Sequence, residues 1–252
     1  MQRTVEVNST VSRIVSLVPS QTELLVDLGL RDKLVGITKF CVHPKELRKE
    51  VQLIGGTKNV KVSLVESLKP DLVIGNKEEN SQGDIEALEQ LLPTWMSDIF
   101  NLEDALEMIR RVGAITGTSE KAAEIVSGIQ TNFATLESLK SSGKSVLYLI
   151  WKNPYIAAGP DTFIDAMLTT LGFRNVMQET RYPEVKLEAI NPDLIFLSSE
   201  PFPFKEKHME ELREQFPESQ VVLVDGEYFS WYGSRLIGAP AYFAKLLNDL
   251  KR

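Results

Sequence analysis

The stretch RIVSLVPSQTELLVDLG, residues 13–29, decides the fold that this sequence predicts. Its first six residues form a short apolar run that is typical of a buried strand, and Pro19 ends the run. Ser20 and Glu23 have the spacing of a helix capping box, and the apolar segment after them ends at Gly29. Residues 34–38 are typical of a second strand. A strand, a helix and a strand in this order predict a βαβ unit and therefore a parallel sheet.

A weak internal repeat predicts two similar α/β lobes. LVESLKPDLVI at residues 64–74 matches LEAINPDLIF at residues 187–196, and each joins a helix end, a proline, an aspartate and a buried strand. The upstream segments 19–29 and 160–172 also correspond, because each contains a loop, a helix cap, an apolar helix and a glycine. The alternative is that such punctuation recurs by chance in α/β proteins.

Almost no strand signal occurs between the two lobes, and a helix about 20 residues long, hence roughly 30 Å, is expected there. One stripe of this helix carries apolar residues at spacings of three and four, namely Val126, Ile129, Phe133 and Leu136. We therefore predict an α/β fold with two lobes of mainly parallel sheet joined by a long, rigid backbone helix. The predicted domains are an N-terminal lobe (1–100), a helical linker with the backbone helix (101–142) and a C-terminal lobe (143–252).

Composition excludes several classes of function. The chain has 252 residues, of which 43% are hydrophobic and 25% charged, so it can form two modest cores under a polar surface. A net charge of −7 argues against a nucleic-acid partner, and no stretch approaches the apolar length that spans a bilayer. The N-terminus lacks the apolar core of a secretory signal. We therefore expect a cytoplasmic location, or a periplasmic or cell-envelope location if a leader has been removed.

The loops that follow strands are the expected ligand site, because open α/β sheets bind ligands beyond the carboxyl ends of their strands. The most unusual of them, YFSWYGSR at residues 228–235, combines four aromatic residues with an arginine. Aromatic faces bind flat ligands and arginine binds carboxylate or phosphate groups, although core packing is the alternative for the aromatic residues. The predicted ligand-binding residues are Phe40, His43, Asn76, Lys77, Trp151, Tyr155, Arg181, Tyr182, Trp231, Tyr232 and Arg235.

No catalytic site and no metal site are predicted. The two histidines are His43, in a loop after a strand, and His208, in a charged stretch that is expected at the surface. Cys41 is the single cysteine, and no spacing of ligands around it and His43 favours a metal. The sequence has neither a nucleophile elbow nor a phosphate-binding P-loop. If the chain were an enzyme, His43 and Glu184 would be the acid–base candidates.

The motif at residues 13–23, the Lys-Pro-Asp strand at residues 69–73, the long helix and the Asn-Pro-Asp strand at residues 191–195 together resemble the helical-backbone metal receptor superfamily. These are substrate-binding proteins of ABC importers for cobalamin, iron(III)-siderophores and haem, with the class III fold. The opening motif is most similar to that of the cobalamin-binding branch. The resemblance implies a non-enzymatic solute-binding protein without an intrinsic cofactor.

The same resemblance implies that a corrinoid, haem or iron(III) chelate binds in the cleft between the lobes, and that an ABC permease is a possible partner of a monomeric chain. A cytoplasmic carrier, a sensor, or a tetrapyrrole- or metallophore-processing enzyme on the same scaffold is the alternative. Lys58, Lys77 and Arg181 stand in these loops and would suit an acidic ligand.

The resemblance also concerns docking to a permease. Family members carry one glutamate per lobe, six residues before the lysine of the Lys-Pro-Asp motif, and here those positions are Ser63 and Val185. Glu66 and Glu188 follow about one helical turn later in each lobe and are the predicted docking residues. A third hypothesis is an interaction module that binds another protein through these two glutamates.

Overall fold

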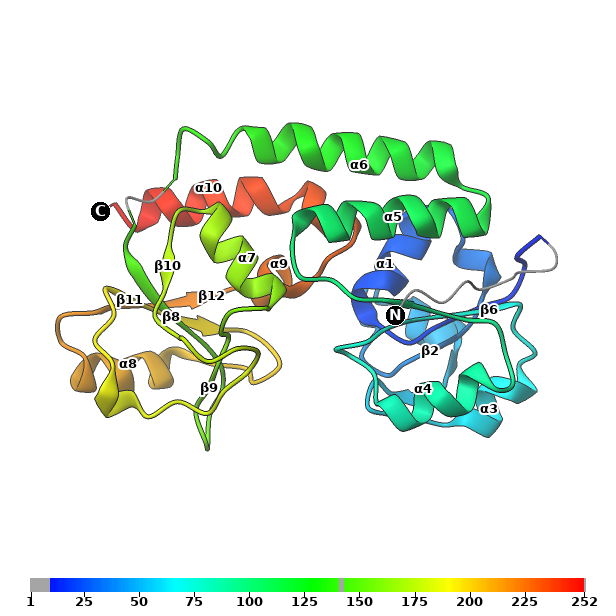
Figure 1. Ribbon diagram of the computed structural model, residues 1–252, viewed down its shortest axis with the longest axis horizontal. Coiled ribbons are helices and arrows are strands. Elements are labelled where there is room, and N and C mark those ends of the chain that lie inside the picture. The colour runs from blue at the N-terminus through cyan, green and yellow to red at the C-terminus, as the bar shows by residue number, and fades with distance from the viewer. Residues whose placement is uncertain (1–9, 141–142, 252) are drawn as a thin grey trace. The chain divides into compact units, whose positions relative to one another are not determined.

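The computed structural model describes residues 10–140 and 143–251, and the chain divides into two compact units (Figure 1). Unit 1 takes the described residues up to Ile99, together with Glu103–Ile129 and Tyr232–Arg235. Unit 2 takes Phe100–Leu102, Gln130–Trp231 and the described residues from Leu236 onward. The first nine residues of the predicted N-terminal lobe and the predicted linker boundary at residue 142 lie outside the described residues.

Unit 1 contains a parallel sheet of five strands in the order β3-β2-β1-β6-β7. The strands are β1 (Ile14–Ser16), β2 (Leu34–Ile37), β3 (Gln52–Leu53), β6 (Leu72–Asn76) and β7 (Thr94–Ser97). A short antiparallel hairpin, β4 (Gly55–Gly56) and β5 (Asn59–Val60), follows β3. The connecting helices are α1 (Pro19–Asp27), η1 (Arg31–Lys33), α2 (Leu47–Glu50), α3 (Val62–Ser67) and α4 (Gln82–Glu89). Figure 1 shows α1 on one face of the sheet and α3 and α4 on the other.

The opening βαβ unit forms as predicted, but its helix begins differently. Helix α1 starts at Pro19, where a missing N–H has no cost, and its N-cap Val18 offers no side-chain cap. The predicted capping box of Ser20 and Glu23 is therefore wrong. Glu23 lies in the second turn of the helix and pairs with Arg235 instead.

The predicted helical segment consists of two helices, α5 (Leu102–Thr116) and α6 (Ser119–Ala134), which are separated at Gly117 with a φ of +74°. The predicted apolar stripe is buried. Gly113 allows α5 to approach α6 closely, because a Cβ at that position would lie 2.4 Å from the Cβ of Ala122. Helix α6 spans 16 residues, fewer than predicted, and the boundary between the two units falls within it, after Ile129.

Unit 2 contains a second, mainly parallel sheet in the order β10-β8-β11-β12, and β9 pairs antiparallel with β8. Its strands are β8 (Ser145–Trp151), β9 (Ile156–Ala157), β10 (Arg174–Asn175), β11 (Leu194–Ser198) and β12 (Gln220–Val224). Its helices are α7 (Phe163–Thr170), η2 (Leu187–Ala189), α8 (Glu206–Gln215), α9 (Gly226–Ser230) and α10 (Ala239–Asp249), and η3 (Ser234–Ile237) spans the last crossing between the units. Met209 and Leu212 of α8 and Phe216 just after it pack against side chains of β8 and β11 in one apolar cluster.

The repeated aspartate has the same structural role in each unit. In unit 1 the Asp71 carboxylate accepts hydrogen bonds from the Ser12 hydroxyl at 2.7 Å and from the N–H groups of Ser12 and Arg13. In unit 2 the Asp193 carboxylate accepts from the hydroxyl and the N–H of Ser145, both at 2.6 Å. The serine hydroxyls are the main reason why the pKa of each aspartate lies below its usual value. Each aspartate thereby ties together the starts of two neighbouring parallel strands, β1 with β6 and β8 with β11.

His208 lies in the core of unit 2. The charged residues around it in the sequence had led us to expect it at the surface, and this prediction is wrong. It is 6% exposed, and its ring lies 5.4 Å from that of Phe202 and 5.6 Å from that of Phe204. Its Nδ1 accepts a hydrogen bond from the N–H of Lys205 at the start of α8. Burial is the main cause that lowers the pKa of His208.

Replacement of Asp71 by alanine should lower the free energy of unfolding by about 1 kcal/mol, because three donors lose a charged acceptor that is partly open to solvent. Ser12→Ala should have a smaller effect, since two backbone donors still reach the carboxylate. Urea denaturation at pH 7 measures both. Equal losses in the two variants would contradict the role of the carboxylate as a shared acceptor.

His208 should make the protein less stable as the pH falls below about 6.5. Its folded pKa lies below the unfolded value, so the unfolded chain binds the proton first, and the loss ends once the pH passes the folded pKa. His208→Gln keeps an acceptor at the same helix position and removes the titration. Thermal unfolding between pH 7 and 5 should therefore show a shallower decline in Tm for the variant. His43 is present in both proteins, so parallel declines would contradict the assignment.

Candidate ligand-binding surfaces

A hollow of about 620 Å³ lies in unit 1, beside the hairpin β4–β5 and the end of β2. The residues that line it are Lys39, Phe40, Leu53, Gly55, Gly56, Thr57, Lys58, Asn59 and Lys61. Phe40 is 49% exposed, and the Lys39 ammonium lies 5.0 Å from the centre of its ring. The lining of this lysine hollow holds three cationic side chains and no carboxylate among the described residues, so its charge favours an anionic ligand.

Backbone geometry builds the rim of the lysine hollow. Gly55 has a φ of +113°, and a Cβ there would lie 2.3 Å from the carbonyl oxygen of Asn59, so only glycine allows this hairpin to close. The Lys58 ammonium donates to the carbonyl oxygens of Glu78 and Asn80. Phe40, one of the predicted ligand-binding residues, lies in the lining of this hollow.

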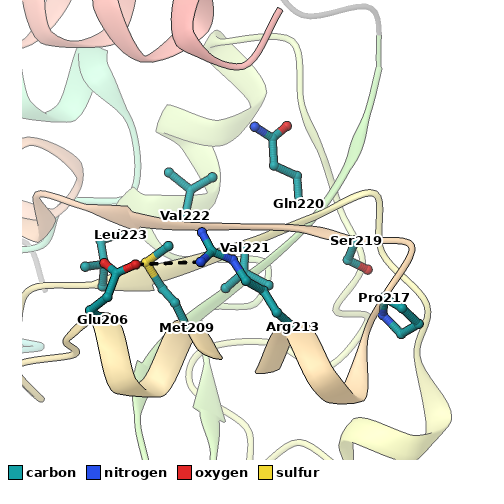
Figure 2. Close-up of a pocket in the computed structure, with 9 residues that line it drawn as sticks. All are labelled: Glu206, Met209, Arg213, Pro217, Ser219, Gln220, Val221, Val222 and Leu223. Carbon is teal, nitrogen blue, oxygen red and sulfur yellow. Dashed lines mark ion pairs between the residues drawn. The ribbon is translucent and has the colours of Figure 1, made fainter. Parts of the chain in front are cut away.

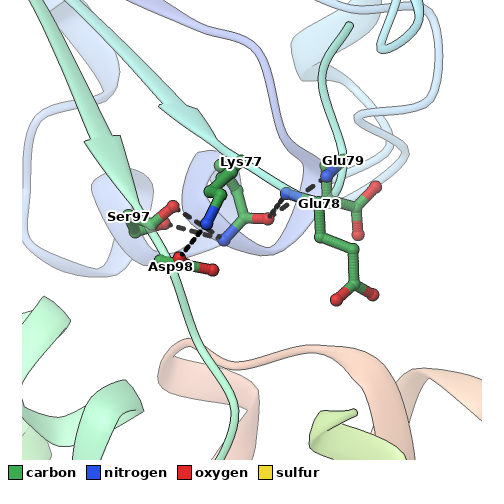
Figure 3. Close-up of polar contacts among 6 residues, drawn as sticks. Lys77, Glu78, Glu79, Ser97 and Asp98 are labelled. Atoms are coloured by element: carbon green, nitrogen blue, oxygen red, sulfur yellow. Dashed lines mark hydrogen bonds and ion pairs between the residues drawn. The ribbon is translucent and has the colours of Figure 1, made fainter. Parts of the chain in front are cut away.

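Asn76 and Lys77 both make polar contacts within unit 1, although Lys77 is exposed. The Asn76 amide donates to Ser97, and its Oδ1 accepts from the N–H groups of Glu78 and Glu79 at 2.8 and 3.2 Å. Lys77 forms an ion pair with Asp98 at 2.7 Å (Figure 3). Asn76, a predicted ligand-binding residue, is 1% exposed, and its side chain instead forms the turn after β6.

Arg235 was predicted to bind a ligand, but its guanidinium makes a bidentate ion pair with Glu23 in unit 1. The two contacts measure 2.6 and 2.9 Å, and both side chains are less than one-fifth exposed. Burial raises the pKa of Glu23, whereas Arg235 and, more weakly, His43 oppose the rise. His43 itself is half-buried and close enough to Glu23 for this effect. The pair therefore serves the packing of the segment Tyr232–Arg235 into unit 1.

Trp231 and Tyr232, which were predicted to bind a ligand, are buried. Residues 226–230 form helix α9, and the two aromatic residues after it are 6% and 5% exposed. The Trp231 indole N–H donates to Glu200 at 2.9 Å, and the Ser230 hydroxyl donates to the same oxygen at 2.8 Å. Burial raises the pKa of Glu200 despite these bonds. Core packing, which was the alternative for these aromatic residues, is what the structure shows.

Unit 2 does present an aromatic surface at the end of β8. Trp151 is 40% exposed, and its ring lies 5.8 Å from the ring of Phe202 in an edge-on arrangement. The N–H of Phe202 donates to the carbonyl oxygen of Ile150, which fixes this loop beside the strand end. Tyr155 is half-buried against the apolar cluster, and Lys152 beside it contacts Glu211. Trp151 and Phe202, here called the Trp151–Phe202 surface, remain accessible for a flat ligand.

Arg181 lies over an aromatic ring of its own unit. Its guanidinium is 4.8 Å from the centre of the Phe100 ring, and its backbone has a φ of +68°. The main chain of Arg181 exchanges hydrogen bonds with Gly159 and Pro160, which holds this unusual conformation. Tyr182 next to it is half-buried.

The remaining predicted residues lie at the surface. Glu66 on α3 and Glu188 on η2 are exposed, one in each unit, and Glu184 is exposed as well. Within the described part of the chain, no cluster of three histidine, cysteine or carboxylate side chains could hold a metal ion. No helix among residues 10–140 and 143–251 is long and apolar enough to cross a bilayer.

Several residues of these surfaces escaped the sequence analysis. Lys39 and Lys61 stand next to predicted loop segments, and their charge could have been noted there. Phe202 follows the two residues Glu200 and Pro201, and no pattern in the sequence shows that this loop returns to the end of β8.

The known proteins most similar in sequence include substrate-binding and vitamin B12-binding proteins. An uncharacterized ABC transporter substrate-binding lipoprotein of Bacillus subtilis is 32% identical over 198 residues, which cover 73% of this chain but only 62% of the lipoprotein. The vitamin B12-binding protein of Vibrio parahaemolyticus is 26% identical over 199 residues, which cover 76% of this chain and 72% of that protein.

Solved structures confirm the predicted class III fold. The periplasmic heme-binding protein RhuT from Roseiflexus sp. RS-1 superimposes with a TM-score of 0.83 at 20% identity, covering 96% of this chain and 100% of that one. The periplasmic vitamin B12-binding protein BtuF of Vibrio cholerae gives 0.82 at 21% identity, with 96% and 99% covered. Residues 14–220 match the family described as periplasmic binding protein, which confirms the resemblance seen in the sequence. The chain belongs to the periplasmic binding protein family.

Proposed function

We propose that this chain is the substrate-binding component of an ABC-type importer and that it captures an anionic metal chelate or tetrapyrrole without transforming it. Membership of the periplasmic binding protein family supports a role in binding a solute. The three lysines of the lysine hollow are the observation that supports an anionic ligand. Relatives named for vitamin B12 and solved structures named for heme are consistent with large, flat, metal-containing ligands. A haem-type or iron(III)-chelate ligand with carboxylate groups fits three lysines better than an uncharged corrinoid does.

Two aromatic surfaces support the proposal of a flat ligand. Phe40 offers an exposed ring beside the lysines of unit 1, and the Trp151–Phe202 surface offers another in unit 2. Aromatic faces stack on conjugated rings at little entropic cost, since each side chain has only two rotatable bonds. Lysine and aromatic groups side by side therefore recognise a ring system with acidic substituents.

The proposed location is the cell envelope. The relatives include a lipoprotein, and the solved structures include proteins named as periplasmic. These names favour a periplasmic or cell-envelope location over the cytoplasmic location that was expected from the sequence.

The proposed partner is an ABC permease. Glu66 and Glu188 are exposed and lie on corresponding segments of the internal repeat, one per unit. One carboxylate on each unit could pair with arginines of a permease, although both stand a helical turn away from the usual family positions. Exposed ion pairs of this kind set orientation and association rate more than affinity.

Haemin should quench the tryptophan fluorescence of the protein with a dissociation constant on the order of 1 μM or tighter. Trp151→Ala should weaken haemin binding about tenfold, since a stacked aromatic contact contributes about 1.4 kcal/mol at most. Trp95→Phe, on β7 of unit 1, is the matched control and should bind as the unaltered chain does. If haemin, cyanocobalamin and a ferric chelate all failed to quench or to raise Tm, the proposed ligand class would be wrong.

The lysine hollow should discriminate between ligands by charge. The triple variant Lys39→Gln, Lys58→Gln, Lys61→Gln should bind haemin about tenfold more weakly at low salt and leave cyanocobalamin, which has no carboxylates, nearly unaffected. Isothermal titration at two salt concentrations measures the difference, which should shrink as salt rises. Lys33→Gln, Lys45→Gln, Lys49→Gln is the control with the same change of charge. Equal losses in both triple variants would show that net charge, not this hollow, attracts the ligand.

A further inference from the structure

Strand β12 forms an open edge of the sheet in unit 2. Among the described residues it pairs with β11 alone, over the whole of Gln220–Val224. The strand carries no charged side chain, and three of its five residues are valine. An edge of this kind presents unpaired N–H and C=O groups and is a template for another strand.

A groove of about 660 Å³ runs along this edge. Its lining includes Gln220 and Val222, which point to one face of the sheet, and Val221 and Leu223, which point to the face covered by α8 (Figure 2). A hollow lined from both faces of one strand must follow its lateral edge. Leu223 is 37% exposed, although it lies beside the core residue Met209.

The backbone groups that face the groove can be assigned. The N–H of Gln220 donates to Asp193, and the carbonyl oxygen of Val224 accepts from Ser199, so both residues face β11. Backbone groups alternate between the two edges of a strand, and therefore those of Val221 and Leu223 face outward.

Charge at the groove is self-complementary. Glu206 lies at the Leu223 end of the groove and Arg213 at the Val221 end, and the two side chains form an ion pair at 3.6 Å (Figure 2). The pair leaves the rim without net charge, so it does not favour a strongly charged foreign peptide. A two-fold rotation exchanges the ends, and it brings Glu206 of one copy to Arg213 of the other.

We propose that a second copy of this chain pairs its β12 antiparallel with this edge, about a two-fold axis at Val222. Val221 then lies opposite Leu223 of the second copy, and their outward N–H and C=O groups hydrogen-bond to each other. The sheet becomes continuous through both copies, and the two exposed leucines are covered. This proposal departs from the monomer expected from the sequence, and it does not depend on the proposed ligand.

Sedimentation equilibrium of the full chain over a range of concentrations tests the proposal. The unaltered chain should reach twice its monomer mass with a dissociation constant in the micromolar range, as small interfaces do. Leu223→Pro removes an outward N–H without touching the ladder to β11 and should raise that constant at least about tenfold. Leu223→Lys, which places a charge at the edge, should do the same if the proline variant fails to fold. Leu91→Lys changes a leucine of unit 1 that is even more exposed than Leu223 and should leave the dimer intact.

Charge reversal provides a second, independent readout. Glu206→Arg alone and Arg213→Glu alone should each weaken the dimer, and the double variant should restore it because opposite charges meet again. A chain that stays monomeric at about 300 μM would overturn the proposal. So would a dimer that is insensitive to both Leu223 variants, since its interface would lie elsewhere. Haemin titration of Leu223→Lys should match that of the unaltered chain, which separates this proposal from the ligand assignment.

Discussion

The carboxylates of Asp71 and Asp193 impose the constraint on which each unit is built. Parallel strands cannot be aligned by a tight turn, because each connection must cross the sheet through a helix. In both units an aspartate just before one central strand accepts hydrogen bonds from a serine at or just before the start of its neighbour, and so holds the two strand starts together. The loop of the Trp151–Phe202 surface follows β8, one of the strands that are tied in this way.

The architecture could be predicted because its signals are local. Apolar runs of strand length, prolines and glycines at their ends, and a helical stripe in the middle of the chain each occupy fewer than about 20 residues. The repeat of Pro-Asp followed by an apolar run anticipated the two corresponding sheets. The start of α1 was mistaken because Pro19 can begin a helix without a side-chain cap, and a polar residue after it therefore carried no information about the boundary.

The binding residues were predicted less well, because the sequence does not show which side chains are already bonded to other groups of the protein. Arg235, Trp231 and Asn76 have the polar or aromatic groups that ligands need, but each finds its counterpart inside the protein. The counterpart of Arg235 is 212 residues away in the sequence, and no local pattern reveals it. Phe40 and Trp151, two of the predicted ligand-binding residues, are exposed, because no other segment covers them where they stand at or just beyond a strand end.

The segment Tyr232–Arg235 affects when unit 1 can finish folding during synthesis of the chain. All other residues of unit 1 precede Gln130 in the sequence, yet the unit also includes this segment of four residues. Glu23 of unit 1 therefore gains its ion-pair partner only when Arg235 has been synthesised. At a synthesis rate of about 5–20 residues per second, roughly 10–40 s separate the emergence of the two partners from the ribosome. During that interval a half-buried carboxylate lacks its counter-charge and the site for Gly233 against Ser20 stands empty. Unit 1 therefore reaches its full stability only after most of unit 2 has been synthesised.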